Sequence, residues 1–279
     1  MKRILVTGEN SYIGTSFVTY MEQFKEEYEI ETISVRGDEW RKKDFSIYDV
    51  VFHVAAIVHK KETKENEKLY FEVNYTLTKE LAEKSKSEGV EHFLFLSTMS
   101  VYGTTSGAIL KDSKLNPTNA YGKSKLKAEN FIKNIETPSF TVTIIRPPMV
   151  YGSNCKGNYK TLNNFAEKVF LFPKVNNKRS MIYIKNLTFI LKKVIDDCLG
   201  GVYCPQNESY IVTSLLFERI RMEKGKKTYL SVFLGFIISK MTSIKIINKI
   251  FGDLYYDFFD FDNLPYSFYE SIEKIEGRK

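Results

Sequence analysis

Cysteine is scarce in this chain, which has only Cys155, Cys198 and Cys204 among its 279 residues. An odd number does not suit a disulfide framework, and these three lack the paired spacing and the histidine partners of a zinc site. We therefore expect reduced thiols, no bound metal and a cytoplasmic location.

Long hydrophobic runs are missing as well. The longest, Leu230 to Ile238, contains Ser231 and Gly235 and falls far short of the roughly 20 residues that span a bilayer. At the N-terminus, Gly8 interrupts the apolar run too early for a signal peptide. The sequence also lacks repeats and glycine-serine linkers, so we expect neither a transmembrane helix nor a flexible tandem architecture.

The composition is that of an ordinary globular protein, with 43% hydrophobic residues and a net charge of +7. Lysines and arginines are scattered among acidic neighbours, as in the segment 60–67. This pattern indicates a solvated surface and no nucleic-acid-binding stripe, although a basic balance suits a polyanionic nucleotide ligand.

Apolar runs alternate with helix-like segments in the first half of the chain. Strands are expected from Lys2 to Gly8 and over 28–35, 49–56, 91–98 and 140–146, with helices over 67–86 and 121–135. This alternation predicts an α/β fold, a Rossmann-type doubly wound parallel sheet, in residues 1–150. Residues 151–279 would form mainly a small C-terminal substrate-binding lobe, and the chain would return to the first domain at about 180–205.

A glycine turn, Gly8-Glu-Asn-Ser-Tyr-Ile-Gly14, follows the first predicted strand. A strand, a tight turn and a helix N-terminus form a site for a pyrophosphate, because backbone N–H groups and the helix dipole point at the anion. Ser11 stands where such a loop usually has its middle glycine. The expected dinucleotide contacts in this loop are Gly8, Asn10, Ser11, Tyr12, Ile13 and Gly14.

Tyr121 and Lys125 are four residues apart, so they share one face of the predicted helix. A phenol is a poor base at neutral pH, but a nearby ammonium stabilises the phenolate and lowers the phenol pKa. The pair could therefore remove a proton from a sugar hydroxyl. Taken alone, it also fits any solvated helix face.

Ligands of parallel sheets bind beyond the carboxyl ends of the strands. In the predicted sheet Gly8, Ala55, Thr98 and Pro147 all lie at such ends. We therefore expect them to converge on one crevice, with Thr98 near Tyr121.

The motifs together resemble the extended short-chain dehydrogenase/reductase superfamily, specifically its NAD(P)-dependent nucleotide-sugar epimerases and dehydratases. The match runs in order through the first two-thirds of the chain, over 7–14, 49–56, Asn74, 96–103, 121–125 and 146–152. The resemblance implies that Tyr121 is the catalytic base and that Lys125 lowers its pKa while holding the nicotinamide ribose. It also implies that Thr98, in preference to Ser97 or Ser100, bonds the reacting oxygen.

Further cofactor contacts follow from the same resemblance. They are Ala55, Ala56, Asn74 and Pro147, with Asp44 and Phe45 bracketing the adenine. The second strand runs into Arg36, where NAD sites usually carry an acidic residue. An arginine suits a 2′-phosphate and favours NADP, whereas Asp38 could serve a ribose hydroxyl and keeps NAD open.

Met99 and Ser100 occupy the positions where the 4,6-dehydratases of this family carry an aspartate and a glutamate. Eliminating water needs a positioned acid and base, and neither side chain is a carboxylate. The expected chemistry is therefore oxidation or reduction at C4, with Ser100 as a substrate contact.

Two later segments, 146–158 and 179–186, are similar to bacterial envelope-polysaccharide enzymes, comprising UDP-hexose 4-epimerases and 4-keto-6-deoxyhexosamine reductases. By this resemblance Arg179 contacts the UDP pyrophosphate, and Lys156 and Asn158 line the sugar-nucleotide side. A homodimer through the long helices is common in the superfamily.

Three functions remain open at this stage: a UDP-sugar 4-epimerase for cell-envelope or capsular polysaccharide precursors, an NADPH-dependent 4-keto-6-deoxy UDP-sugar reductase, and a non-catalytic dinucleotide-binding regulator. The intact Thr98, Tyr121 and Lys125 favour the two enzymes. The basic amphipathic stretch 243–251 either touches a membrane peripherally or packs on its own domain. His53, on an apolar strand, is expected to be a core histidine.

Overall fold

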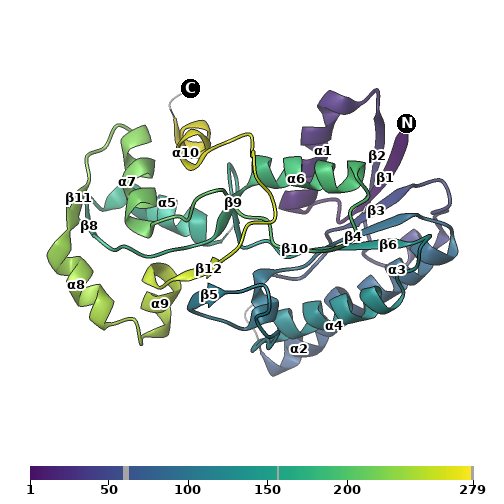
Figure 1. Ribbon diagram of the computed structural model, residues 1–279, viewed down its shortest axis with the longest axis horizontal. Helices are drawn as coiled ribbons and strands as arrows, with labels where there is room; N and C mark the ends of the chain where they lie inside the picture. The colour runs from purple at the N-terminus through teal and green to yellow at the C-terminus, as the bar shows by residue number, and fades with distance from the viewer. Residues whose placement is uncertain (59–62, 156, 278–279) are drawn as a thin grey trace. The chain divides into compact units, whose positions relative to one another are not determined.

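The computed structural model describes residues 1–58, 63–155 and 157–277 and divides the chain into two compact units (Figure 1). The first unit comprises 1–103, 114–147 and 188–204. The second comprises 104–113, 148–187 and 205–279. The chain therefore leaves the first unit twice and re-enters it at Lys114 and at Thr188.

A six-stranded parallel sheet forms the first unit, in the order β10-β6-β4-β3-β1-β2. Its strands are β1 (Lys2–Thr7), β2 (Tyr28–Ile33), β3 (Val50–His53), β4 (His92–Leu96), β6 (Thr141–Ile145) and β10 (Gly201–Tyr203). Because β1 pairs with β2 on one side and β3 on the other, the strand order reverses at β1. The doubly wound α/β fold is confirmed.

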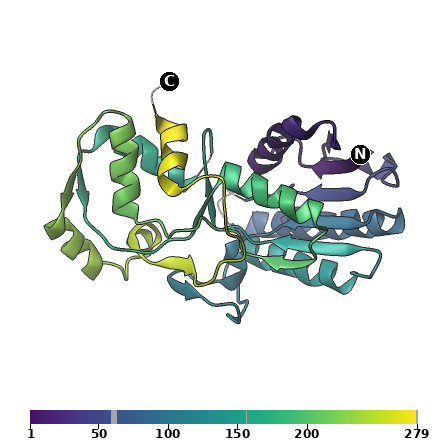
Figure 2. The same ribbon diagram turned by 45° about the horizontal axis from the view of Figure 1, so that its top comes forward.

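Helices cover both faces of this sheet (Figures 1 and 2). On one face lie α1 (Tyr12–Met21) and the 188–196 part of α6 (Ile184–Asp196). On the other lie α2 (Lys64–Phe71), α3 (Leu77–Ser87) and α4 (Ala120–Asn134). The helix expected over 67–86 differs from the prediction, because a π turn at Glu72–Thr76 separates α2 from α3 and carries the buried Asn74.

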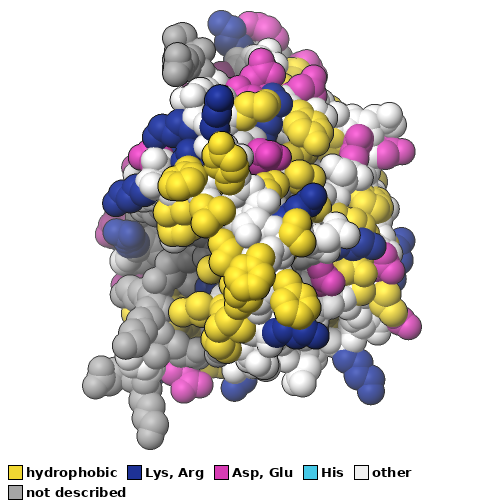
Figure 3. Space-filling model, turned by 90° about the vertical axis from the view of Figure 1, so that its left-hand side faces the viewer, with side chains coloured by type: hydrophobic (Ala, Val, Ile, Leu, Met, Phe, Trp, Pro, Cys, Tyr) yellow, Lys and Arg dark blue, Asp and Glu magenta, His cyan; other side chains and the backbone are white. Residues whose placement is uncertain are grey.

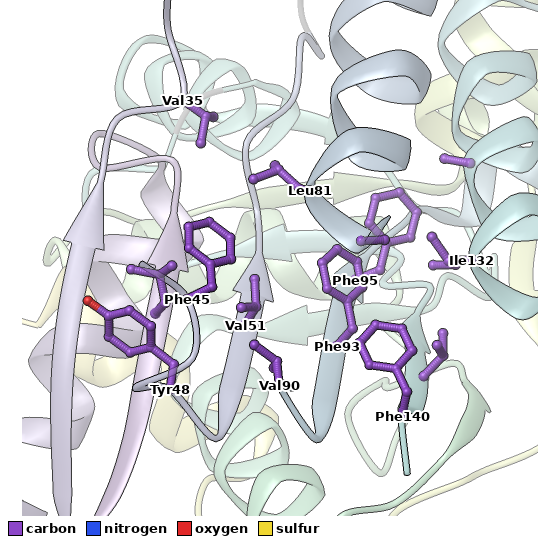
Figure 4. Close-up of a cluster of buried hydrophobic side chains, with 14 of the residues drawn as sticks. Val35, Phe45, Tyr48, Val51, Leu81, Val90, Phe93, Phe95, Ile132 and Phe140 are labelled. Atoms are coloured by element: carbon purple, nitrogen blue, oxygen red, sulfur yellow. The ribbon is translucent and has the colours of Figure 1, made fainter. Parts of the chain in front are cut away.

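The core of the first unit lies between the sheet and its flanking helices (Figure 4). Leu5, Val51, Phe93 and Ile144 come from four neighbouring strands and are fully buried or nearly so. These strands are buried on both faces, which is why their sequences are continuous apolar runs without polar alternation.

The second unit contains three pairs of short parallel strands. The pairs are β5 (Gly107–Ile109) with β12 (Leu254–Tyr256), β7 (Met149–Tyr151) with β9 (Met181–Tyr183), and β8 (Leu171–Pro173) with β11 (Tyr229–Ser231). Its helices are α5 (Asn158–Lys168), α7 (Thr213–Glu223), α8 (Val232–Lys240), α9 (Lys245–Phe251) and α10 (Phe268–Glu276). Aromatic contacts hold it together, such as Phe172 stacked on Phe217 with centroids 3.9 Å apart.

Within the described residues, every helix is too short or too polar to traverse a bilayer. All three cysteines are free thiols.

Candidate active site

The glycine turn lies at the point where the strand order reverses. Gly8 has φ +100°, and a Cβ added there would lie 2.9 Å from the backbone N of Ala55. The turns after β1 and β3 therefore approach each other so closely that only glycine fits. In open α/β sheets this switch point is where nucleotides bind.

Ser11 has a role in this turn that the sequence pattern did not reveal. It is the N-cap of α1, and its Oγ accepts a hydrogen bond from Gly14 N at 3.0 Å. Asn10 is exposed in the turn, and Tyr12 and Ile13 are the first residues of α1. The serine at the middle-glycine position thus preserves the strand, turn and helix N-terminus that a pyrophosphate needs.

Asn74 fixes the loop that carries Ala55 and Ala56. Its Oδ1 accepts from Ile57 N at 2.9 Å, and its Nδ2 donates to Ile57 O at 3.1 Å and to Ser124 Oγ at 3.2 Å. Because both ends of its amide bond the protein, Asn74 holds the loop in place from the π turn. The cofactor contact expected at Asn74 stays a prediction.

Tyr121, Thr98 and Lys125 come together as the topology predicts. The Tyr121 hydroxyl is hydrogen-bonded to the side chain of Thr98. Lys125, one turn further along α4, is 1% exposed, and its Nζ donates to Leu96 O at 2.7 Å. The end of β4 and the first turns of α4 therefore bring a phenol, a hydroxyl and an amine into one place.

A second close approach brings α4 against the turn after β4. A Cβ on Gly122 would lie 2.7 Å from Ser100 O, and Asn119 caps the helix by accepting from Gly122 N at 2.7 Å. Ser100 is partly buried beside this contact. The absence of a side chain at Gly122 therefore lets α4 lie close to the turn that follows Thr98.

The pKa values of the pair differ from the sequence-based expectation. Burial raises the pKa of Tyr121 to about 12, against a smaller lowering by the Thr98 hydrogen bond. Burial also lowers the pKa of Lys125 to about 7, although the charge of Glu129 opposes this. In the chain by itself desolvation dominates the pKa of both groups, and the lowering of the Tyr121 pKa by Lys125 stays a prediction.

The sequence patterns did not reveal two buried residues that support this site, Glu129 and Arg146. Arg146 Nη2 lies 2.6 Å from Glu129 Oε2, and its Nη1 donates to Tyr102 Oη at 2.9 Å. Ser97 Oγ donates to the same carboxylate. The one sequence signal was the spacing, because Glu129 follows Lys125 by four residues and so lies on the same helix face.

Pro147 and His53 also lie at this edge of the sheet, and both bond to other residues of the protein. Pro147 O accepts from Met99 N at 3.0 Å, so it fixes the turn that carries Thr98. His53 is a core histidine, as predicted, with Nδ1 2.6 Å from Thr7 Oγ1 and Nε2 2.9 Å from Thr78 Oγ1. Burial, and secondarily the charge of Lys125, holds the His53 pKa well below its usual value.

The expectation that Asp44 and Phe45 bracket the adenine needs correction at Phe45. Phe45 is fully buried in the core, and its N–H donates to Glu88 Oε2 at 2.6 Å (Figure 4). Its ring therefore packs inside the protein and presents no face to a ligand. Asp44 is exposed and accepts from Ser46 N at 2.9 Å, which lowers the Asp44 pKa together with the bond from the Ser46 hydroxyl.

Arg36 lies just past the end of β2 and is exposed. Gly8 N donates to Ile33 O at 3.1 Å, so this strand end is adjacent to the glycine turn. Asp38 forms an exposed ion pair with Arg41 at 2.9 Å.

The expected substrate residues outside this unit are described by themselves. Arg179, in the second unit, donates from Nη1 to Gly252 O at 2.8 Å, and burial lowers its pKa. Its backbone pairs with Ile211. Lys156 lies outside the described residues, and Asn158 begins α5.

Comparisons with known proteins agree with this arrangement. Residues 4–203 match the NAD dependent epimerase/dehydratase family. The chain is 33% identical over 221 residues to a UDP-glucose 4-epimerase of Vibrio cholerae, covering 70% of this chain and 67% of that protein. It is 30% identical over 138 residues to an N-acetyl-α-D-glucosaminyl-diphospho-ditrans,octacis-undecaprenol 4-epimerase of Escherichia coli O157:H7, covering 48% of this chain and 42% of that one.

A solved structure shares the fold. The UDP-glucuronic acid 4-epimerase of Bacillus cereus, in complex with NAD, aligns with a TM-score of 0.73 at 18% identity over 98% of this chain and 95% of that chain. The family match spans the sheet, the glycine turn and the Thr98, Tyr121 and Lys125 cluster. The chain therefore belongs to the NAD-dependent epimerase/dehydratase family, within the extended short-chain dehydrogenases/reductases.

Proposed function

We propose that this protein transfers hydride at C4 of a UDP-sugar as a 4-epimerase, in the supply of precursors for cell-envelope or capsular polysaccharide. The observation that carries the proposal is the hydrogen bond between Tyr121 and Thr98, with Lys125 one turn away. A base, a partner for the reacting oxygen and an amine that can carry a charge are the groups that such chemistry needs.

In this reaction the Tyr121 oxygen takes the proton of the C4 hydroxyl, while the Thr98 hydroxyl holds the same C4 oxygen. A bound dinucleotide would supply the acceptor and then the donor of the C4 hydride. When the hydride returns to the opposite face of C4, Tyr121 returns the proton to the C4 oxygen. The net result would be inversion of the sugar at C4 without net oxidation or reduction.

The fit of a dinucleotide rests on the glycine turn. The space that a Cβ at Gly8 would fill, beside Ala55 and the N-terminus of α1, allows a phosphate to approach the backbone closely. Gly8, Ser11 and Gly14 shape this turn, and Lys125 is buried at the nicotinamide end by analogy with the family.

Met99 and Ser100 restrict the chemistry. They form the short turn directly after Thr98 and supply no carboxylate for loss of water. Redox at C4 therefore fits these residues better than dehydration.

A second candidate is NADPH-dependent reduction of a 4-keto-6-deoxy UDP-sugar. Arg36 favours it, because an exposed guanidinium beside the glycine turn suits a 2′-phosphate. Tyr121 would then donate a proton to the C4 carbonyl oxygen, and each turnover would consume one NADPH. The third candidate, a dinucleotide-binding regulator, would have no need of the Thr98, Tyr121 and Lys125 cluster.

From the family resemblance we propose four substrate contacts, each taken by itself: Arg179, Lys156, Asn158 and Ser100. A guanidinium has five N–H donors in a planar fork, which suits a diphosphate. Arg179→Gln is expected to raise KM for a UDP-sugar more than it lowers kcat.

The deciding experiment first identifies any cofactor that co-purifies with the protein. The protein is then incubated with UDP-glucose or UDP-N-acetylglucosamine without added cofactor, and separately with a 4-keto-6-deoxy UDP-sugar plus NADPH. Epimer formation without added cofactor supports the epimerase, and stoichiometric loss of NADPH supports the reductase. Tyr121→Phe is expected to lower either rate by about 10²- to 10⁴-fold, the usual contribution of a general base. Tyr70→Phe, with its ring 6.4 Å from that of Tyr121, is the matched control.

A further inference from the structure

The second unit exposes a large apolar surface on two consecutive helices. The side chains that define this α8–α9 surface are Val232 (69% exposed), Phe233 (72%), Phe236 (61%), Ile237 (37%), Met241 (36%), Ile244 (47%), Ile246 (71%) and Ile250 (43%). Figure 3, which faces the side where α8 and β11 lie, shows hydrophobic side chains gathered in a band with lysine or arginine side chains beside it. Soluble monomers rarely expose so many large apolar groups together.

The orientation of α8 is set by Gly235. A Cβ at Gly235 would lie 2.0 Å from Lys174 O, so the glycine side of the helix is pressed onto the chain after β8. The exposed positions 232, 233, 236, 237 and 240 then fall within roughly 140° of the helix circumference. The apolar face cannot turn inward without a clash at Gly235.

The helix α9 also presents its apolar side outward. Phe251 packs on Phe172 with centroids 5.6 Å apart, while Ile246 and Ile250 remain exposed. Of the two alternatives for the stretch 243–251, packing on its own domain therefore accounts for only part of its apolar side chains.

The charges on the two helices are of one sign. The segment 232–251, which contains α8 and α9, has three lysines, Lys240, Lys245 and Lys249, and no aspartate or glutamate. Lys240 and Lys249 are exposed on the same two helices, and Lys240 Nζ lies 5.5 Å from the Phe236 ring centroid. Two copies of this surface placed face to face would set lysines against lysines, which disfavours a second copy as its occupant.

We infer that the α8–α9 surface binds peripherally to an anionic lipid bilayer. Helices with aromatic and aliphatic side chains on one face and lysines beside them lie in the interface, with the apolar groups among the acyl chains and the ammonium groups at the phosphates. The chain would then be held at the membrane surface while its soluble substrate diffuses to it. This inference does not depend on the C4 chemistry.

The test is flotation of the full-length protein with vesicles of phosphatidylcholine alone or of equal parts phosphatidylcholine and phosphatidylglycerol. The protein is expected to float with the anionic vesicles and to bind at least about tenfold less well to the neutral ones. Raising NaCl from about 0.1 M to about 1 M should weaken binding, because the Debye length falls to about 3 Å.

Two double variants separate the apolar and charged contributions. Phe233→Ser with Phe236→Ser should lower binding to anionic vesicles by at least about tenfold, since two aromatic groups lose their burial. Lys240→Glu with Lys249→Glu should lower it by about 25-fold, at about fivefold for each lysine lost. Both pairs are exposed, so turnover of a soluble UDP-sugar should not change.

Ile47→Ser is the matched control, because Ile47 is 45% exposed in the first unit and should not affect flotation. Failure of the wild-type protein to float, equal binding to both vesicles, or unchanged binding by either double variant would overturn the inference. Light scattering in which the Phe233 and Phe236 variant turned a dimer into a monomer would also overturn it, by assigning the surface to a second copy.

Discussion

Arg146 and Glu129 form a buried ion pair that joins the residue after β6 to the middle of α4, with Nη2 and Oε2 2.6 Å apart. Burial alone would lower the pKa of Arg146, but the hydrogen bonds and charge of Glu129 outweigh it and raise that pKa. Because α4 also carries Tyr121 and Lys125, this pair sets the helix against the sheet.

Glu129→Gln is expected to lower the free energy of unfolding by about 3–5 kcal/mol, because it leaves the Arg146 charge buried without its counter-ion. Urea unfolding monitored by circular dichroism measures the change. The control is Glu29→Gln at the exposed pair with Arg3, where the loss should stay below about 1 kcal/mol. Equal losses in the two variants would contradict a structural role for the buried pair.

The lowered pKa of Lys125 predicts that the free energy of unfolding depends on pH. Its pKa is about 7 in the folded chain, against an ordinary value of 10.5, so below pH 7 both folded and unfolded chains hold the proton and the buried ammonium destabilises the fold. From pH 7 to 10.5 only the unfolded chain still binds it, and stability rises with pH.

Lys125→Met removes this dependence. The unfolding free energy of the variant should exceed that of the wild-type protein most at about pH 6. This excess should shrink by about 3 kcal/mol by about pH 9. Lys123→Met, an exposed lysine of the same helix, controls for the loss of one charge. An excess independent of pH would show that Lys125 stays charged in the fold.

Gly8→Ala should weaken NAD(P) binding by more than about tenfold, because the new Cβ would lie 2.9 Å from Ala55 N. Fluorescence titration with the dinucleotide measures it. Gly89→Ala is the matched control, since Gly89 has φ +85° but open space around its Cβ. That control should cost about 1–2 kcal/mol of stability without changing binding.

Arg36→Gln tests the choice of cofactor. Loss of a charge-assisted contact to the 2′-phosphate should weaken NADP binding by about 10-fold or more and leave NAD binding nearly unchanged. Calorimetric titration of both dinucleotides gives the two constants. If the substitution changed both affinities equally, Arg36 would not distinguish the cofactors. That result would favour an epimerase that uses NAD over a reductase that uses NADPH.

Much of the first unit follows from local sequence. The strands are continuous apolar runs because a parallel sheet buries both faces, and the glycine turn and the Tyr121–Lys125 spacing are local patterns with local causes. Even the proximity of Thr98 to Tyr121 follows from the rule that strand ends of a parallel sheet face one crevice. The family motifs then suggest the roles that we propose for Thr98, Tyr121 and Lys125.

Other features depend on contacts between segments far apart in the chain. Phe45 follows a polar residue that resembles a ligand contact, yet its ring is buried in the core. The residues around this ring come from strands and helices elsewhere in the sequence. The pairing of Glu129 with Arg146, the raised pKa of Tyr121 and the outward apolar face of α8 likewise need the packed structure. Local pattern determines which side chains share a face, whereas burial and charge compensation are decided only when distant elements pack together.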